Sequence, residues 1–323
     1  MNQVAKRRWR RVDGVLLLDK PTGMSSNDAL QKARRLFSAE KGGHTGTLDP
    51  MATGLLPLCF GEATKFSADL LNADKTYEAE LRLGITTRTG DAEGEVIEER
   101  PVAVDEAAFA AVLPAFRGEQ QQVPPMYSAL KRDGKPLYEL ARQGIEVERA
   151  PRTITIHVLE LLSYAAPVAR IRVRCSKGTY IRTLAEDIGK TLGCGAHLTA
   201  LRRTVVADLP LPRALTLAEI EACPESERDA LLQPVDALLQ GLPEVVLDEA
   251  GRARFSNGNP VPSPQAGLLG PCRVYFAQTL LGLGRAEADG TLHPQRLVAN
   301  CVARADDYLA PITASISAKV LSS

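Results

Sequence analysis

The chain has 323 residues, of which 45% are hydrophobic and 24% charged, and its formal net charge is zero. This length suggests a large domain with a small one, or two medium domains, and the composition is that of a globular protein with a substantial core. No run of 18 apolar residues is present, which argues against a membrane span. No apolar stretch of signal-peptide length follows the basic N-terminus, so we expect a cytoplasmic protein.

The six cysteines form no C-x-x-C pair, and the four histidines are scattered along the chain. This spacing argues against a zinc site, and we expect reduced, mostly buried thiols. No glycine loop of the phosphate-cradling kind follows a predicted strand. We therefore expect neither a metal nor an organic cofactor.

Positive charge is concentrated at a few points. Residues 6–11 place five cations around Trp9, residues 202–203 are both arginine, and residues 131–132 form a Lys-Arg pair in a loop. Cations beside stackable aromatic rings suit a nucleic-acid backbone. For residues 6–11 the alternative is a disordered, solvated tail.

The N-terminal third begins with a short apolar run, residues 14–19, which predicts a buried strand. A Pro/Gly turn follows, and then Ser25 or Ser26 can cap a helix that continues through Phe37. Three glycines and a proline within residues 42–50 exclude a regular helix and predict a shaped loop.

The next segments alternate between strands and helices. The apolar run 55–60 contains Pro57, which favours an edge strand. Residues 62–71 have a helical pattern. Residues 75–83 alternate apolar and polar side chains as a strand does, with Tyr77 on the apolar face.

The middle of the chain contains one long polar segment. An amphipathic helix is predicted over residues 105–116. Residues 118–149 then contain two adjacent prolines and three glycines, with one short helix near residues 137–142. A loop-like segment this long is usually functional or mobile.

The C-terminal half begins with two adjacent strands, predicted over residues 153–162 and 170–175. Residues 179–192 show apolar residues at a spacing of four, which predicts a helix. A proline-punctuated link, residues 210–243, leads to short apolar segments over residues 245–303 that suit a small barrel.

Asp49 is the strongest candidate for a catalytic group. A carboxylate on a glycine-rich loop that precedes a proline can be fixed rigidly while the backbone comes close to a ligand. The alternative is a turn aspartate that bonds only to its own backbone.

Several segments, taken together in their order and spacing, extend this observation. They are G-V-L-L-L-D-K-P-x-G-M-S-S (residues 14–26), G-H-T-G-T-L-D-P (43–50), M-A-T-G-L-L-P-L-C-F-G-E-A-T-K (51–65), D-K-T-Y (74–77), V-P-P-M-Y-S-A-L-K (123–131), C-S-K-G-T-Y-I-R-T-L (175–184) and G-A-H-L-T-A-L-R-R-T (195–204). Through these segments the chain resembles the TruB family, the bacterial tRNA pseudouridine-55 synthases. Near the C-terminus, F-x-N-G-N-P-V (255–261) and P-x-R-L-V (294–298) are similar to a PUA domain.

The resemblance implies an α+β fold: a mixed, largely antiparallel central sheet flanked by helices, with a small C-terminal β-barrel of the PUA type. It divides the chain into a basic tail (1–12), a catalytic domain (13–243) with an RNA-gripping insertion (about 118–149), a PUA-like RNA-binding domain (244–305) and a weakly ordered tail (306–323).

The resemblance also implies roles for individual residues. Asp49 would be the nucleophile, attacking either the uracil ring or the ribose C1′, and the sequence leaves both open. Tyr77 would stack on the base and help remove the C5 proton. Arg182 would pair with Asp49, because a nearby guanidinium favours the ionised carboxylate.

Four further residues would bind the substrate. His44 would fill the space that the extruded base leaves, and stacking there is worth roughly 1–3 kcal/mol. Tyr180 and Leu201 would close the pocket around the uracil, and Lys20 would contribute to it. Judged from the residues alone, Leu201 could equally be a core residue and Lys20 a surface lysine.

The implied function is isomerisation of uridine 55 in the T-loop of tRNA by base flipping, without a cofactor. The partner would be tRNA, gripped at the T-arm and at the acceptor end through the PUA-like domain. We expect a monomer with no obligate protein partner. Two alternatives remain: a guide-RNA-dependent synthase, and a tRNA-folding chaperone whose isomerase activity is incidental.

Overall fold

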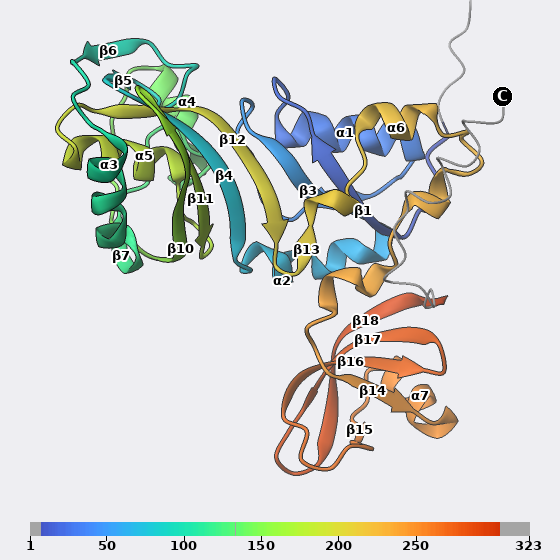
Figure 1. The fold of residues 1–323 in the computed structure, drawn as a ribbon. Coiled ribbons are helices and arrows are strands. Elements are labelled where there is room, and N and C mark those ends of the chain that lie inside the picture. Colours follow the sequence, from blue (N-terminus) through green and yellow to red (C-terminus); the bar gives the residue numbers. More distant parts are fainter. Residues whose placement is uncertain (1–7, 133, 304–323) are drawn as a thin grey trace, which may run out of the picture.

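The computed structural model of the chain describes residues 8–132 and 134–303 (Figure 1). The tail predicted over residues 306–323 lies outside the described residues, as do residues 1–7 of the basic N-terminal tail. Figure 1 shows a large sheet with helices packed on it and, below it, a smaller C-terminal sheet. The expected α+β class is therefore confirmed.

The large sheet contains nine strands within the described residues, in the order β1-β3-β12-β4-β11-β10-β7, with β2 beside β3 and β13 beside β12. Its pairs are antiparallel except for β3 with β12. The strands are β1 (Gly14–Lys20), β2 (Gly42–His44), β3 (Thr53–Phe60), β4 (Lys75–Leu83), β7 (Gly118–Gln122), β10 (Arg152–Ala165), β11 (Val168–Cys175), β12 (Ala196–Val206) and β13 (Leu209–Pro210). Two separate hairpins are β5 (Ile85–Thr87) with β6 (Val96–Glu99), and β8 (Lys131–Arg132) with β9 (Lys135–Pro136).

The helices are short, and several are 3₁₀ turns. The α-helices are α1 (Ser26–Phe37), α2 (Ser67–Leu71), α3 (Glu106–Val112), α4 (Leu137–Arg142), α5 (Ile181–Thr191), α6 (Leu217–Ala222) and α7 (Glu249–Ser256). The 3₁₀ turns are η1 (Gly61–Phe66), η2 (Leu113–Phe116), η3 (Leu211–Arg213), η4 (Arg228–Leu231) and η5 (Val235–Leu239). Of the two candidate caps of α1, Ser25 is the one used, because its side chain accepts a bond from the Asp28 N–H.

Two strand assignments differ from the expectation. β3 is not an edge strand, since it lies between β1 and β12. Pro57 is tolerated because it falls between Gly54, where pairing with β12 stops, and Leu58, where pairing with β2 starts. The segment expected to be loop-like from residue 118 opens with β7, which forms five register pairs with β10.

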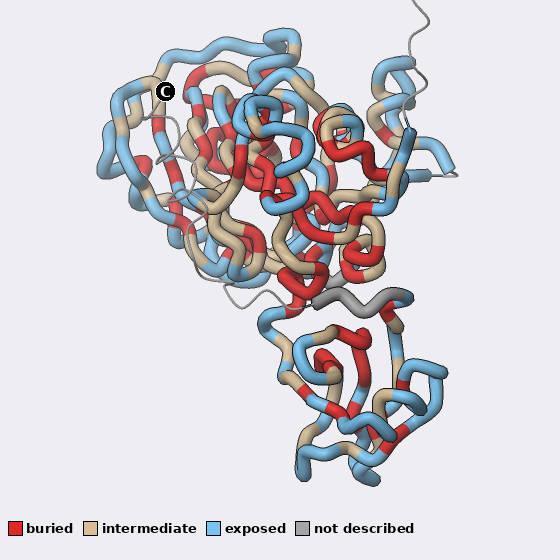
Figure 2. Tube along the Cα trace, turned by 90° about the vertical axis from the view of Figure 1, so that its right-hand side faces the viewer, coloured by how far each residue is buried: buried red, intermediate tan, exposed pale blue. Residues whose placement is uncertain are grey.

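The two faces of β1 bury different cores. Leu16 and Leu18 belong to a cluster with residues of α1 and α5, whereas Val15 and Leu17 pack on the opposite side with η1 and η5. The buried residues run through the sheet in Figure 2. Burying each such leucine contributes roughly 1.5–3 kcal/mol, so both clusters stabilise the sheet that carries the site.

The C-terminal sheet has five strands within the described residues, in the order β14-β16-β17-β18-β15. These are β14 (Glu244–Leu247), β15 (Val261–Pro262), β16 (Gly270–Phe276), β17 (Thr279–Ala286) and β18 (Thr291–Ala303). The expected barrel is thus a curled sheet, and no pairing of β14 with β15 occurs among the described residues. Tyr275 and Leu283 from this sheet pack into the same cluster as Leu17 and Phe66, so the two sheets share a core.

Candidate active site

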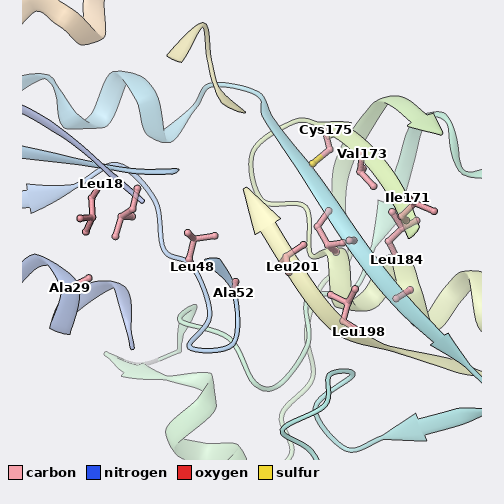
Figure 3. Packing of buried hydrophobic residues seen from close by; sticks show 14 of the residues in the cluster. Leu18, Ala29, Leu48, Ala52, Ile171, Val173, Cys175, Leu184, Leu198 and Leu201 are labelled. Atoms are coloured by element: carbon pink, nitrogen blue, oxygen red, sulfur yellow. The ribbon is translucent and has the colours of Figure 1, made fainter. Parts of the chain in front are cut away.

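The loop that carries Asp49 is fixed on both sides. Leu48 and Ala52 are buried in the same core cluster as Leu18 and Ala29, and in Figure 3 they lie between Leu18 and Leu201. The Ser26 hydroxyl accepts a bond from the Leu48 N–H (2.7 Å) and donates one to the Leu48 carbonyl (3.0 Å). Asp49 is therefore presented by a rigid loop, as its Gly/Pro context predicted.

Arg203 connects this loop to β3. Its side chain is buried, and it donates to the Leu55 carbonyl (2.7 Å) and to the Gly46 carbonyl (3.1 Å). Gly54 has a φ of +102°, and a Cβ there would lie 2.3 Å from the Arg203 carbonyl oxygen. Arg203 is thus a buried loop support, and the expectation of a phosphate-binding surface cation at this position is wrong.

Lys20 supports the same loop from the other side. Its ammonium group is fully buried and donates to the carbonyls of Pro21 (2.8 Å), Met24 (2.6 Å) and Pro50 (3.3 Å). Burial lowers its pKa to about 8. Lys20 is not among the residues that line the pocket at Asp49. In this geometry the amine fixes the loop, and the expected substrate contact stays a prediction.

Arg182 lies between two carboxylates. Its Nε is 3.0 Å from Asp49 Oδ2, and its Nη1 is 3.5 Å from Asp91 Oδ2. The guanidinium also donates to the carbonyls of Thr89 (2.9 Å) and Tyr127 (2.7 Å). Arg182 comes from the first turn of α5 and is only 5% exposed, so its orientation is determined by partners on three other segments.

The Asp49 side chain is 36% exposed, which leaves its carboxylate accessible from the pocket. Burial raises the pKa of this carboxyl above its ordinary value, Arg182 lowers it, Asp91 raises it, and Lys20 lowers it. Arg182 thus acts in the expected direction, but burial outweighs it and the pKa is raised overall. Approach of a ligand that expels further water would add to the same imbalance, so the cations are needed to maintain the ionised form.

A pocket of about 380 Å³ opens beside Asp49. Tyr77, Tyr180 and Leu201 line it together with Arg182. Leu201 is opposite Ala79 in the β4–β12 register, and Tyr77 is opposite Arg203, so both face the pocket from adjacent strands. The structure therefore brings five of the seven predicted site residues to one place: Asp49, Tyr77, Tyr180, Arg182 and Leu201.

The two tyrosines of the pocket are neutral donors. Burial raises the pKa of Tyr77, which Arg203 only partly offsets, and burial also raises the pKa of Tyr180. Tyr180 is the residue before α5 and not a member of its apolar stripe, and its backbone N–H and carbonyl both bond to the Gln122 side chain (2.8 and 3.1 Å). β7 thereby positions the wall of the pocket.

His44 is on β2, two residues before Gly46, whose carbonyl accepts a bond from Arg203. Its Nδ1 accepts a bond from the Gly46 N–H at 3.4 Å. Burial and the Arg203 charge lower the pKa of His44, which favours a neutral ring suited to stacking. His44 is not among the residues that line the pocket, although Gly46, to which it is bonded, is one of them.

Two residues of the site, Asp91 and Gln122, escaped the sequence analysis, and Arg203 has a role in the loop that the sequence analysis did not give it. Asp91 sits in a polar turn that gives no sign of burial, and it is 3% exposed. Gln122 lies in the polar segment whose composition predicts a loop. Arg203 could have been found, because it lies two residues after Leu201 on a strand and so faces the same side.

Other features of the molecule lie away from this pocket. A larger cavity of about 990 Å³ lies between the two sheets, and none of the predicted site residues lines it. Within residues 8–132 and 134–303, no group of three or more His, Cys, Asp or Glu side chains could bind a metal ion. No helix of these same residues is long and apolar enough to cross a membrane.

Family models of pseudouridylate synthases match three consecutive stretches. They are the N-terminal domain of the TruB family pseudouridylate synthases (residues 34–181), the C-terminal domain of tRNA pseudouridylate synthase B (182–240) and the C-terminal part of pseudouridine synthase II TruB (243–298). A tRNA pseudouridine synthase B from Dechloromonas aromatica (strain RCB) is 63% identical over 293 residues, covering 91% of this chain and 98% of the relative. The chain belongs to the TruB family of pseudouridylate synthases. It is therefore an enzyme, an isomerase, as the resemblance implied.

Further relatives agree with this family. A tRNA pseudouridine synthase B from Burkholderia mallei (strain NCTC 10247) is 62% identical over 296 residues and covers 90% of this chain and 98% of the relative. Among solved structures, a Cbf5-Nop10-Gar1 complex gives a TM-score of 0.65 at 26% identity, covering 94% of this chain and 90% of that one. The archaeal box H/ACA sRNP Nop10-Cbf5 complex gives 0.64 at 25% identity, with coverage of 88% and 85%. The pseudouridine synthase fold is confirmed.

Proposed function

We propose that this TruB-family isomerase converts uridine 55 in the T-loop of tRNA to pseudouridine, with Asp49 as the nucleophile. The observation that carries the proposal is the Asp49 carboxylate at 3.0 Å from Arg182, open to a pocket lined by Tyr77, Tyr180 and Leu201. A carboxylate, a fixed cation and two aromatic rings around a space of about 380 Å³ suit a single flipped base.

The chemistry conserves all atoms of the substrate. Asp49 attacks the ribose C1′ or the uracil ring, the N1–C1′ bond breaks, the base turns, and C5 bonds to C1′. The bond between Asp49 and the substrate then breaks, which restores the free carboxylate. The C5 hydrogen leaves as a proton and N1 gains one. The raised pKa of Tyr77 means that its phenol enters the reaction protonated, so it serves first as a hydrogen-bonding and stacking group. Tyr77 could accept the C5 proton only after losing its own phenolic proton.

Base extrusion needs groups that replace the lost stacking. His44 is next to the loop with a ring whose pKa is lowered, and we assign it to the space left in the T-loop. Lys20, Ser26 and Arg203 fix the loop and act through Asp49. The C-terminal sheet, whose family model covers residues 243–298, would contact the acceptor end of the tRNA. We expect a monomer in the cytoplasm.

A stand-alone enzyme is favoured over a guide-dependent one. The relatives that share 62–63% identity over nearly their whole length are named tRNA pseudouridine synthase B, whereas the chains from box H/ACA complexes share 25–26%. Activity on tRNA alone, without guide RNA, separates these two readings.

The test is tritium release from unmodified tRNA that carries [5-³H]uridine. Native protein should release about one equivalent per tRNA without added guide or cofactor, and Asp49→Asn should release none. Sequencing should place the product at position 55. Release by both proteins would remove Asp49 as nucleophile, and bound tRNA without any release would favour a folding chaperone.

A further inference from the structure

The N-terminal basic segment is anchored to the end of α1. The Arg10 N–H donates to the Ser38 carbonyl (2.8 Å), and the Glu40 N–H donates to the Arg10 carbonyl (3.0 Å). The Arg10 guanidinium is also paired with Asp229 (2.7 Å). Residues 8–11 are therefore placed on the folded domain, and the alternative of a wholly solvated tail does not describe them.

This anchoring presents Trp9 to solvent. Its side chain is 45% exposed, although it is the single tryptophan of the chain. The Arg34 guanidinium lies 5.2 Å from the ring centroid. Arg34 is in turn fixed by the carbonyls of Ala39 (3.3 Å) and Glu40 (2.8 Å). One face of the ring thus rests on a fixed cation, while much of the rest stays accessible.

Exposed cations occur in the segments that carry Trp9 and Arg34 and in the turn after α1. Arg8, Arg35 and Lys41 are all exposed, and none of them forms an ion pair within the described ranges 8–132 and 134–303. By contrast, Lys32 on the same helix is neutralised by Glu221 at 2.8 Å. We call Arg8, Trp9, Arg35 and Lys41 the Trp9 patch.

The Trp9 patch is linked to His44 through Arg34 and β2. Arg34 packs against Gly42, where an added Cβ would meet its side chain at 3.0 Å. Gly42 begins β2, and His44 ends it two residues later, about 7 Å along the strand. A nucleic acid that is contacted by His44 needs to extend only a few nucleotides to reach Trp9.

We propose that the Trp9 patch is a second RNA-contact surface, on which one base stacks against the open side of Trp9 while Arg8, Arg35 and Lys41 contact phosphates. This inference rests on the proposed function for the identity of the ligand as RNA. Stacking on an aromatic ring beside backbone-binding cations is tolerant of sequence, so the patch would add affinity without selecting a base. The cation–π pair with Arg34 orients the Trp9 ring before RNA binds.

The single tryptophan allows a direct test. Asp49→Asn protein, which should bind without turnover, is titrated with unmodified tRNA while Trp9 emission and filter binding are recorded together. We expect emission to be quenched with the same Kd that filter binding gives. Retained tRNA binding with unchanged Trp9 emission at saturation would overturn this contact alone, and absence of tRNA binding would remove the proposed function as well.

Substitutions supply the second readout. Trp9→Ala should weaken tRNA binding about tenfold and raise KM with kcat unchanged, and Trp9→Phe should restore most of the affinity. The double variant Arg35→Gln/Lys41→Gln should make log Kd less steep against log salt by about 0.7–0.9 per lost phosphate contact. Lys32→Gln, which removes a paired cation from the same helix, is the matched control with a smaller change. An unaltered salt slope in the double variant, or quenching by a short acidic peptide as strong as by tRNA, would contradict the proposal.

Discussion

The Ser26 hydroxyl bonds to both the N–H and the carbonyl of Leu48, the residue that precedes Asp49. Its neighbour Ser25 has a different task, capping α1 through the Asp28 N–H. Two adjacent serines therefore have separate tasks: Ser26 positions the Asp49 loop, and Ser25 stabilises the helix. This division can be tested with a matched pair of substitutions.

Ser26→Ala should lower kcat about 10- to 100-fold, because it frees the loop that carries Asp49, the proposed nucleophile. It also leaves a buried donor and acceptor of Leu48 without their partner, at about 1–3 kcal/mol of unfolding free energy. Ser25→Ala should cost about 1 kcal/mol of stability through the lost cap and leave kcat unchanged. Single-turnover tritium release and thermal melts measure both. Equal kcat values for the two variants would contradict the assignment.

The pH dependence of kcat/KM should respond in opposite directions to two neighbours of Asp49. Arg182 lowers the pKa of Asp49 and Asp91 raises it. Arg182→Gln should therefore move the acidic limb to higher pH, beyond any general loss of rate, and Asp91→Asn should move it to lower pH. Glu95→Gln removes an exposed carboxylate paired with Arg88 and serves as the control. A shift of the acidic limb in the same direction in both variants would refute this electrostatic account.

Adjacent arginines on β12 should differ sharply in their effect on stability. Arg203→Met leaves the carbonyls of Leu55 and Gly46 unpaired and should lower the unfolding free energy by about 2–5 kcal/mol. Arg202→Met removes a partly exposed ion pair with Asp19 and should cost less than about 1 kcal/mol. Denaturant unfolding of the two proteins makes the comparison. A similar loss in both would show that burial of Arg203 is not what matters.

Tyr275 joins the C-terminal sheet to the catalytic domain through Asp236, with which its hydroxyl is hydrogen-bonded in a buried setting. Tyr275→Phe should lower the unfolding free energy by about 1–3 kcal/mol and leave kcat on bound tRNA unchanged. Tyr138→Phe, whose hydroxyl is exposed, is the control. A large kcat defect in a folded Tyr275→Phe protein would mean that the junction also affects the chemistry.

Hydrogen exchange should divide the expected insertion into two parts. β7 is paired with β10 in the large sheet, so its amides should be protected with and without tRNA. Residues 123–149 contain the small hairpin and α4, and we expect their protection to rise when tRNA binds. Equal protection of α4 in both states would count against ordering by RNA.

Local pattern predicted those elements whose signal is contained in their own residues. β4 is found at residues 75–83 because its side chains alternate, and α4 is found at residues 137–142 because its polar neighbours frame one helical turn. β3 and β7 were misjudged because a strand's place in a sheet depends on partners distant in sequence. In sequence, Pro57 is typical of an edge strand. In the structure it falls where the pairing of β3 with β12 has ended and the pairing with β2 has not yet begun.

The sequence by itself determined the family, and it singled out the Asp49 loop and the residue types that the proposed chemistry needs. Only the tertiary structure decided how those groups act, since burial and distance are properties of the packed chain. It made Lys20 and Arg203 supports of the loop, and it placed Asp91 beside Arg182. The raised pKa of Asp49 follows from that packing, because desolvation outweighs one nearby cation when a second carboxylate shares it.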